Sequence, residues 1–191
     1  MSLYHSALKS QVWEGPGCDR FNLGQSVAFV HNVFEHLPTD EYSKCDILYM
    51  EPPWPSGYEV FNRRAHVEEG RTYGELMRRI GTIISSVSIP VALLIGKKAA
   101  AYLPQPDYVR ETRLNGGKVW LAGYRLQVDE TRSSRTILRE LAERFNCVGD
   151  PFCGYGYSGQ AFREQGKDFV LSDHNPNCIG YVAEHAEGWG R

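Results

Sequence analysis

A glycine-rich stretch constrains the fold most strongly, because glycines at this spacing join a strand to a helix. In "VGDPFCGYGYSGQAFREQGKDFVLSD", Gly154, Gly156 and Gly159 follow a short apolar run and precede a helix-forming segment. Glycine permits the tight turn and lets a ligand approach the backbone. Asp173 ends the next apolar run, about where a carboxylate binds ribose hydroxyls. The stretch predicts a site for an adenosine-containing cofactor; a tight turn without a ligand is the alternative.

The residues around this turn favour one class of cofactor over another. A dinucleotide-binding fold places such a unit early in the chain, whereas only 173–191 follow it here. Asp150, directly before the turn, would repel a pyrophosphate but stabilise a positively charged group. S-adenosylmethionine carries a sulfonium and an amino group and has no phosphate. We therefore expect S-adenosylmethionine rather than NAD.

Several short apolar runs predict the strands of a sheet. The run "IPVALLIG" is apolar throughout, which is typical of a strand buried on both faces of a parallel sheet. Further strands are expected over "SVAFVHN" and "CDILYM". The alternating segment around Asn115-Gly116-Gly117 predicts a β-hairpin. The sheet is therefore expected to be mostly parallel, with one antiparallel hairpin.

Amphipathic segments between these runs predict helices. Thr72 caps the segment "YGELMRRIGTIISS", with Glu75 in the capping-box position. Ser133 or Ser134 caps "SRTILRELAERF". The segment "VFEHLP" predicts a short helical turn stopped by Pro38. The alternation of strands and helices predicts a doubly wound α/β sheet.

Length and composition indicate one domain without a metal site. The chain has 191 residues, of which 42% are hydrophobic, so we expect a single domain over 1–191, with an irregular arm over 1–25. Five scattered cysteines form no C-x-x-C pair, which argues against a zinc site. A net charge of −2 argues against wrapping duplex DNA by charge alone. There is no apolar signal core and no run long enough to span a bilayer, so a cytoplasmic protein is expected.

Two stretches resemble a known family. "DPFCGYGYSG" resembles the D-P-F-x-G-x-G-T segment of S-adenosylmethionine-dependent methyltransferases that modify base amino groups in DNA. "DILYMEPPW" resembles their catalytic D-P-P-Y/W segment, which is D-P-P-W in the mRNA adenosine methyltransferases. The catalytic segment comes first, as in the circularly permuted β group. The likeness runs from about Ser26 to Arg191, and between 55 and 129 it concerns architecture only. It implies a Rossmann-like methyltransferase fold.

The resemblance implies cofactor contacts at matching positions. The methionine part would lie on the turn, the ribose on the acid after the next strand, and the adenine near the end of an earlier strand. The residues at these positions are Asp150, Phe152, Gly154, Gly156, Asp173 and Asn32. The chain departs from the family where Glu51 replaces Asp or Asn, where Tyr157 replaces Thr, and in having no sizeable target-recognition insert.

The catalytic segment fits transfer to an exocyclic amine. Such a nitrogen is a poor nucleophile because its lone pair is conjugated into the base ring. Glu51 and the Pro52 carbonyl are expected to accept its two N–H bonds, since the rigid Pro52-Pro53 pair fixes the carbonyls. Trp54 would stack on an extruded base. This requires the two strand ends to lie side by side, with Trp54 facing a pocket walled by Gly154.

A loop over 55–71 is the candidate substrate loop. Tyr58, Arg63, Arg64 and Arg71 combine aromatic and basic side chains that suit nucleic acid, although a solvated loop is the alternative. By analogy with the family, the substrate is expected to be adenine N6 in DNA. Three alternatives remain: an RNA adenine, a protein glutamine, and a catalytically impaired module that only binds.

Overall fold

The computed structural model describes residues 16–35, 37–55, 57–58, 62, 71–114, 117–129 and 132–190. The first fifteen residues of the expected N-terminal arm lie outside these ranges. So does most of the expected substrate loop, including Arg63 and Arg64.

Eight strands form one sheet, in the order β1-β2-β8-β7-β3-β4-β6-β5. The central strands β2, β8, β7, β3 and β4 run parallel, while β1 and the β5–β6 hairpin pair antiparallel at the two edges. The predicted mostly parallel α/β sheet with an antiparallel hairpin is confirmed. The strands are β1 Arg20–Leu23, β2 Ser26–Val30, β3 Ile47–Met50, β4 Val91–Ile95, β5 Tyr108–Leu114, β6 Gly117–Tyr124, β7 Cys147–Asp150 and β8 Asp168–Asp173.

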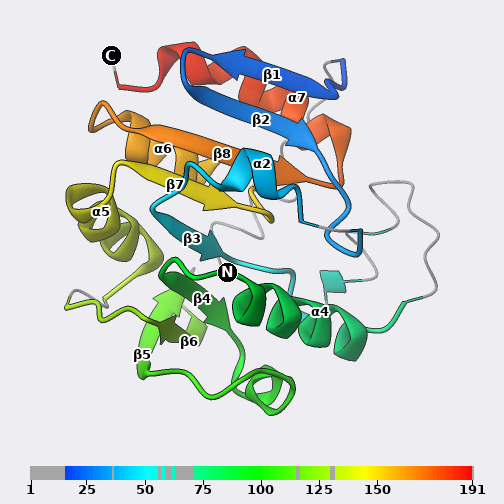
Figure 1. Ribbon diagram of the computed structural model, residues 1–191, viewed down its shortest axis with the longest axis vertical. Helices are drawn as coiled ribbons and strands as arrows, with labels where there is room; N and C mark the ends of the chain where they lie inside the picture. The colour runs from blue at the N-terminus through cyan, green and yellow to red at the C-terminus, as the bar shows by residue number, and fades with distance from the viewer. Residues whose placement is uncertain are drawn as a thin grey trace.

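Helices cover both faces of this sheet (Figure 1). Helices α2 and α4 lie over one face and α5, α6 and α7 over the other, and two separate apolar clusters fill the space between sheet and helices. The helices are α2 Thr39–Tyr42, α4 Tyr73–Ser86, α5 Ser134–Arg144, α6 Tyr157–Arg163 and α7 Pro176–His185, with short 3-10 helices η1 Lys97–Tyr102 and η2 Ala186–Gly188.

Capping residues fix where the two longest helices begin. Thr72 caps α4, and the Thr72 and Glu75 side chains bond reciprocally to each other's backbone N–H. Ser133 and Thr136 form the same arrangement at α5. Each box satisfies two backbone donors that the first helical turn leaves unpaired. Both predicted helix starts are confirmed, and both helices begin at the end of the sheet where the central strands finish.

The structure differs from the local predictions at two places. Part of the expected irregular arm forms the edge strand β1, which pairs antiparallel with β2. The short helical turn expected before Pro38 is one hydrogen-bonded turn, in which the Asn32 carbonyl accepts the Glu35 N–H at 2.9 Å, and a helix that was not expected, α2, follows Pro38. Its first turn closes on the Pro38 carbonyl, which accepts the backbone N–H of Glu41 and Tyr42 at 3.2 and 3.1 Å. Proline is favourable at the start of a helix because no donor is needed there.

The five parallel strands all end at one side of the sheet, which we call the carboxyl edge. In open α/β sheets ligands bind outside this edge. In the described part of the chain, no helix is long and apolar enough to cross a membrane. Nor does any group of three or more acidic, histidine or cysteine side chains in those ranges suit a metal ion.

Candidate active site

The segment Glu51-Pro52-Pro53-Trp54 follows β3 and reaches the carboxyl edge beside the glycine turn. Strands β3 and β7 are parallel hydrogen-bonded neighbours, with Leu48 opposite Gly149. Parallel neighbours end at the same edge, so the segment after β3 lies next to Asp150 at the end of β7. The prediction that these two strand ends lie side by side is confirmed.

The carboxyl group of Glu51 is held by a tyrosine two residues earlier, in β3. Tyr49 Oη donates a hydrogen bond to Glu51 Oε2 at 3.0 Å. Burial raises the pKa of Glu51 to about 7, and the Tyr49 hydrogen bond opposes part of this shift. Glu51 is therefore a fixed acceptor that changes its charge near neutral pH.

Trp54 lies on the β4 side of its strand. Its ring comes within 3.2 Å of the position that a Cβ on Gly96 would occupy, and it packs against the apolar cluster on the α5 face. The end of β4 thus fixes the position of the ring, and its facing a pocket at Gly154 stays a prediction. Pro52 is buried and Pro53 half-buried, which fixes the backbone on which Trp54 stands.

The Asp150 carboxylate holds the glycine turn from inside. Its Oδ1 accepts the Phe152 N–H at 2.9 Å, and its Oδ2 accepts the Ser158 hydroxyl at 2.6 Å. Only 3% of Asp150 is exposed, and burial raises its pKa to about 7, with the nearby charges of Glu51 and Asp173 acting in the same direction. Each carboxylate oxygen keeps a second acceptor site for a ligand donor.

This raised pKa predicts how stability depends on pH. Between about pH 4 and 7 Asp150 is ionised in the unfolded chain but protonated in the folded one, so its contribution to stability falls as pH rises. Asp150→Asn keeps both hydrogen bonds, because the Ser158 hydroxyl can reverse its role. We expect this variant to lose less stability than the wild type between pH 5 and 7.5, by about 2–4 kcal/mol.

Denaturant unfolding across that pH range measures the effect. Asp40→Asn is the matched control, since Asp40 is exposed and removing its charge leaves no buried carboxyl altered. An Asp150→Asn variant with the wild-type pH dependence would contradict the assignment of a buried, protonated carboxyl.

The glycine turn has a left-handed backbone at two positions, which glycine adopts without strain. Gly154 and Gly156 have φ of +49° and +80°, in the left-handed region. A Cβ on Gly156 would lie 2.6 Å from the Trp189 ring and 2.9 Å from Val182. Beside Gly154, by contrast, no described atom lies within 4 Å of the Cβ position. The turn is therefore packed against other side chains at Gly156 and leaves space for a ligand at Gly154.

The ends of β8 and β2 complete this part of the edge. Asp173 Oδ2 accepts the Gly154 N–H at 3.0 Å, and its Oδ1 accepts the Asn175 N–H at 2.9 Å. The His31 N–H donates to the Asp173 carbonyl at 3.0 Å, which ties the end of β2 to the end of β8. Asn32 follows at once, and its Oδ1 accepts the Phe34 N–H. All six positions proposed for cofactor contact thus lie at three adjacent strand ends.

The chemistry of these strand ends suits a cationic ligand. The carboxyl groups of Glu51, Asp150 and Asp173 lie near one another, since the first and third both raise the pKa of the second. A bound positive charge would favour the ionised carboxylates and compensate for their burial. A phosphate would meet repulsion instead. The position beside Gly154 gives such a ligand access to the backbone.

Two of the four residues expected to bind nucleic acid lie in the described part of the chain, one buried and one exposed. Tyr58 is buried at 5% exposure and packs edge-on against Tyr73, with ring centroids 6.2 Å apart. It is a core residue rather than a surface for stacking. Arg71 is exposed, with its guanidinium 4.3 Å from the centroid of the Phe34 ring.

Sequence reasoning missed the residues that support the turn. Ser158 bonds to Asp150, and Trp189 packs against the turn glycines. Tyr42, at the end of α2, packs against the strands that carry the turn, and its hydroxyl lies 2.8 Å from the hydroxyl of Ser172 in β8. Among the supporting residues, Tyr49 could have been found from the sequence, because it lies two residues before Glu51 and residues i and i+2 of an extended chain point to the same face.

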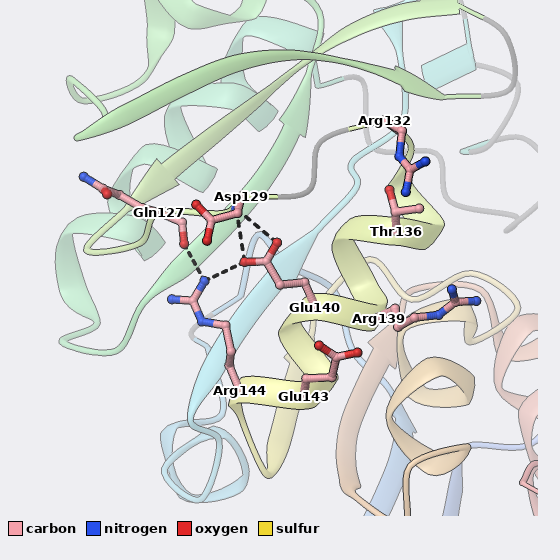
Figure 2. Close-up of a pocket in the computed structure, with 8 residues that line it drawn as sticks. All are labelled: Gln127, Asp129, Arg132, Thr136, Arg139, Glu140, Glu143 and Arg144. Atoms are coloured by element: carbon pink, nitrogen blue, oxygen red, sulfur yellow. Dashed lines mark hydrogen bonds and ion pairs between the residues drawn. The ribbon is translucent and has the colours of Figure 1, made fainter.

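A hollow of about 650 Å³ lies elsewhere, along α5 (Figure 2). Its acids and bases neutralise one another: Arg144 bonds to Glu140 at 2.9 Å and to the Gln127 carbonyl, and Glu140 accepts the Asp129 N–H. No residue of the β3 or β7 ends lines it. The lining residues are Gln127, Asp129, Arg132, Thr136, Arg139, Glu140, Glu143 and Arg144. An open surface whose three acids and three arginines balance in charge is a poorer candidate site than the carboxyl edge.

Solved structures share the fold of the chain at low sequence identity. The M1.HpyAVI–SAM complex has a TM-score of 0.52 and 10% identity, over 82% of this chain and 96% of that one. M1.HpyAVI has a TM-score of 0.55 and 12% identity, over 84% and 98%. A Thermus thermophilus protein described as a DNA modification methylase has a TM-score of 0.53 and 10% identity, over 75% and 87%.

No protein-family model matches the sequence, and no curated protein matches it. The likeness is therefore one of structure. It spans nearly the whole length of each methylase as well as most of this chain. The chain has the fold of DNA methylases, with a single mixed sheet and an antiparallel hairpin at one edge.

Proposed function

We propose that the chain transfers a methyl group from S-adenosylmethionine to the exocyclic amine of a nucleic-acid base, namely adenine N6 in DNA. One observation carries the proposal: β3 and β7 pair in parallel, which puts Glu51 next to the acidic glycine turn. A hydrogen-bond acceptor for an amine and a site for a cationic cofactor thus share one edge of the sheet.

S-adenosylmethionine fits the donor set at the ends of β7 and β8. Its sulfonium and amino groups are the positive charges that buried carboxyl groups favour. We place its methionine part along the turn, its ribose at Asp173 and its adenine near Asn32. The turn residues concerned are Asp150, Phe152, Gly154 and Gly156. When bound, the cofactor supplies an electrophilic methyl group.

The residues after β3 activate the accepting nitrogen. Glu51 and the Pro52 carbonyl each accept one N–H of the amine, which draws the nitrogen toward a tetrahedral shape and frees its lone pair. Glu51 also stabilises the positive charge that develops on the nitrogen as the new bond forms. Tyr49 keeps the carboxylate in place during the reaction, since it is bonded to Oε2. Preorganised acceptors, rather than a strong base, provide the catalysis.

Trp54 provides the flat surface on which an extruded base stacks. Such stacking contributes about 1–3 kcal/mol per base. The ring is half-buried and supported by Gly96 and the apolar cluster behind it, so it presents a rigid face. The fold shared with DNA methylases supports DNA as the substrate.

Calorimetric titration with S-adenosylhomocysteine tests the cofactor half of the proposal. We expect one site per chain, and no binding would reject the cofactor assignment. Transfer of a tritiated methyl group tests the other half, with DNA, RNA and a glutamine-containing protein as separate acceptors. Label in DNA is the expected result. Label in RNA or protein alone selects one of the alternatives, and binding without transfer selects the non-catalytic module.

A further inference from the structure

The carboxyl edge has a second half with the opposite charge. Strand β6 begins at this edge and β5 ends at it, because β6 runs antiparallel to both β4 and β5. The ends of these strands and η1 bring four exposed basic side chains to the edge, whereas the β7 and β8 half carries acids. The four basic residues are Lys97, Lys98, Arg113 and Lys118.

An aromatic ring lies within this basic half. Trp120 stands opposite Ile95, the last residue of β4, and is half-buried. The Lys97 ammonium lies 5.6 Å from the centroid of the Trp120 ring. A cation over an indole face is an attractive pair that also holds the ring in a fixed orientation.

The hairpin extends this surface beyond Trp120. Arg113 and Lys118 face each other across β5 and β6, so their side chains leave the same face of the sheet. They share that face with Trp120, since alternate residues of a strand point the same way. Lys118 forms an exposed ion pair with Glu111 at 2.9 Å, which leaves Arg113 and the two η1 lysines as the larger sources of positive charge.

The basic half adjoins the candidate active site at the end of β4, where Trp54 packs against the apolar cluster on the α5 face and Trp120 against the cluster on the α4 face. Trp54 contacts Gly96, and Lys97 and Lys98 follow that glycine directly. A strand of nucleic acid with one base on Trp54 would therefore have its next phosphates near these lysines. We call Lys97, Lys98, Arg113, Lys118 and Trp120 the β4–β6 surface.

We propose that the β4–β6 surface binds the nucleic-acid strand next to the target base, with phosphates on its basic side chains and one unpaired base on Trp120. The inference rests on the proposed function and adds to it the place where the substrate strand runs. Basic side chains around an aromatic ring are the combination that binds unpaired strands, because the ring stacks on a base while the cations neutralise phosphates. The acidic half of the edge repels the same strand and is left to the cationic cofactor.

Salt dependence of binding tests the phosphate contacts. The probe is a fluorescein-labelled single-stranded DNA followed by anisotropy between about 50 and 200 mM salt, where log K falls with a slope of about 0.7 per phosphate contact. Lys97→Gln/Lys98→Gln is expected to reduce the slope by about 1.4. The matched control is Lys44→Gln/Lys167→Gln, which removes the same charge at the opposite edge, three residues before β3 and directly before β8.

Substitution of the ring tests the stacking contact. Trp120→Leu is expected to weaken oligonucleotide binding on the order of tenfold, whereas Trp120→Phe, which keeps an aromatic face, restores most of it. Thermal unfolding of both variants reports any damage to packing. Equal binding by the leucine and phenylalanine variants would overturn the role of the ring.

The outcomes separate this inference from the proposed function. A slope that changes only in the Lys97/Lys98 variant supports the β4–β6 surface. Equal slopes in both double variants, or a wild type that does not bind the oligonucleotide, would overturn it. Titration with S-adenosylhomocysteine is measured on the same samples. Binding of this ligand together with an unchanged slope rejects the surface alone, and its failure to bind rejects the proposed function.

Discussion

Glu51→Gln is expected to lower the rate of methyl transfer by about 10²–10³-fold, as for loss of one preorganised electrostatic group. The amide keeps the size of the side chain but loses the negative charge that stabilises the developing positive nitrogen. Binding of S-adenosylhomocysteine should be unchanged, because this ligand has no sulfonium charge. Single-turnover rates and calorimetry on the same preparation give both results.

The pH profile provides a control for this prediction. Because burial raises the pKa of Glu51 to about 7 in the free protein, the wild-type kcat/KM should rise as pH increases through that value and then level off. The Tyr49 hydrogen bond opposes the raised pKa, so Tyr49→Phe should move the midpoint of the rise to higher pH. A rate that does not vary between pH 6 and 8 would contradict the role of Glu51.

Glu51→Asp distinguishes an active enzyme from an impaired one. The Tyr49 bond holds the longer side chain in place, so the shorter aspartate should lose that bond and lower the rate by on the order of a hundredfold. An aspartate variant more active than the wild type would instead show that the chain is an impaired relative of an active enzyme.

Gly156→Ala is expected to destabilise the protein by about 2–4 kcal/mol and to abolish cofactor binding. A left-handed residue costs about 1–2 kcal/mol with a Cβ, and overpacking adds a similar amount. The new methyl group would lie 2.6 Å from the Trp189 ring, so the turn must move. Denaturant unfolding and S-adenosylhomocysteine titration measure the two effects.

Two comparisons separate backbone strain from crowding at this glycine. Gly24 has φ +62° and no described atom within 4 Å of its Cβ position, so Gly24→Ala should show the strain alone, about 1 kcal/mol. In a Trp189→Ala background, Gly156→Ala should cost less than in the wild type, because the main obstacle is gone. Equal costs in the two backgrounds would exclude Trp189 as the cause.

The sequence was sufficient to predict the elements whose signals are local. The apolar run of β4, the Thr72 and Ser133 caps and the glycine turn each follow from neighbouring residues, and all are found in the structure. The adjacency of β3 and β7 needed the family resemblance as well, since nothing local to either strand specifies its partner. In the family that the sequence resembles, the catalytic and cofactor segments follow neighbouring strands, which implied that β3 and β7 pair.

The remaining features depend on contacts between distant residues. Tyr58 follows a proline-rich exit and looks like a surface residue, yet it packs on Tyr73 from α4. Trp54 packs on Gly96, directly after β4, where the absence of a side chain leaves room for its ring. The basic β4–β6 surface arises only when the hairpin is placed beside β4. Such placements follow from packing of the whole sheet, which periodicity does not report.

Mass spectrometry of nucleosides tests the central claim most directly. Unmodified DNA is incubated with the protein and S-adenosylmethionine, digested to nucleosides and compared with the same reaction containing Glu51→Gln. We predict N6-methyldeoxyadenosine with the wild type. The variant should form on the order of a hundredfold less of it, because the carboxylate is lost. Unmodified DNA, or equal methylation by both proteins, would contradict the assignment of Glu51 and the glycine turn to one methyl-transfer site.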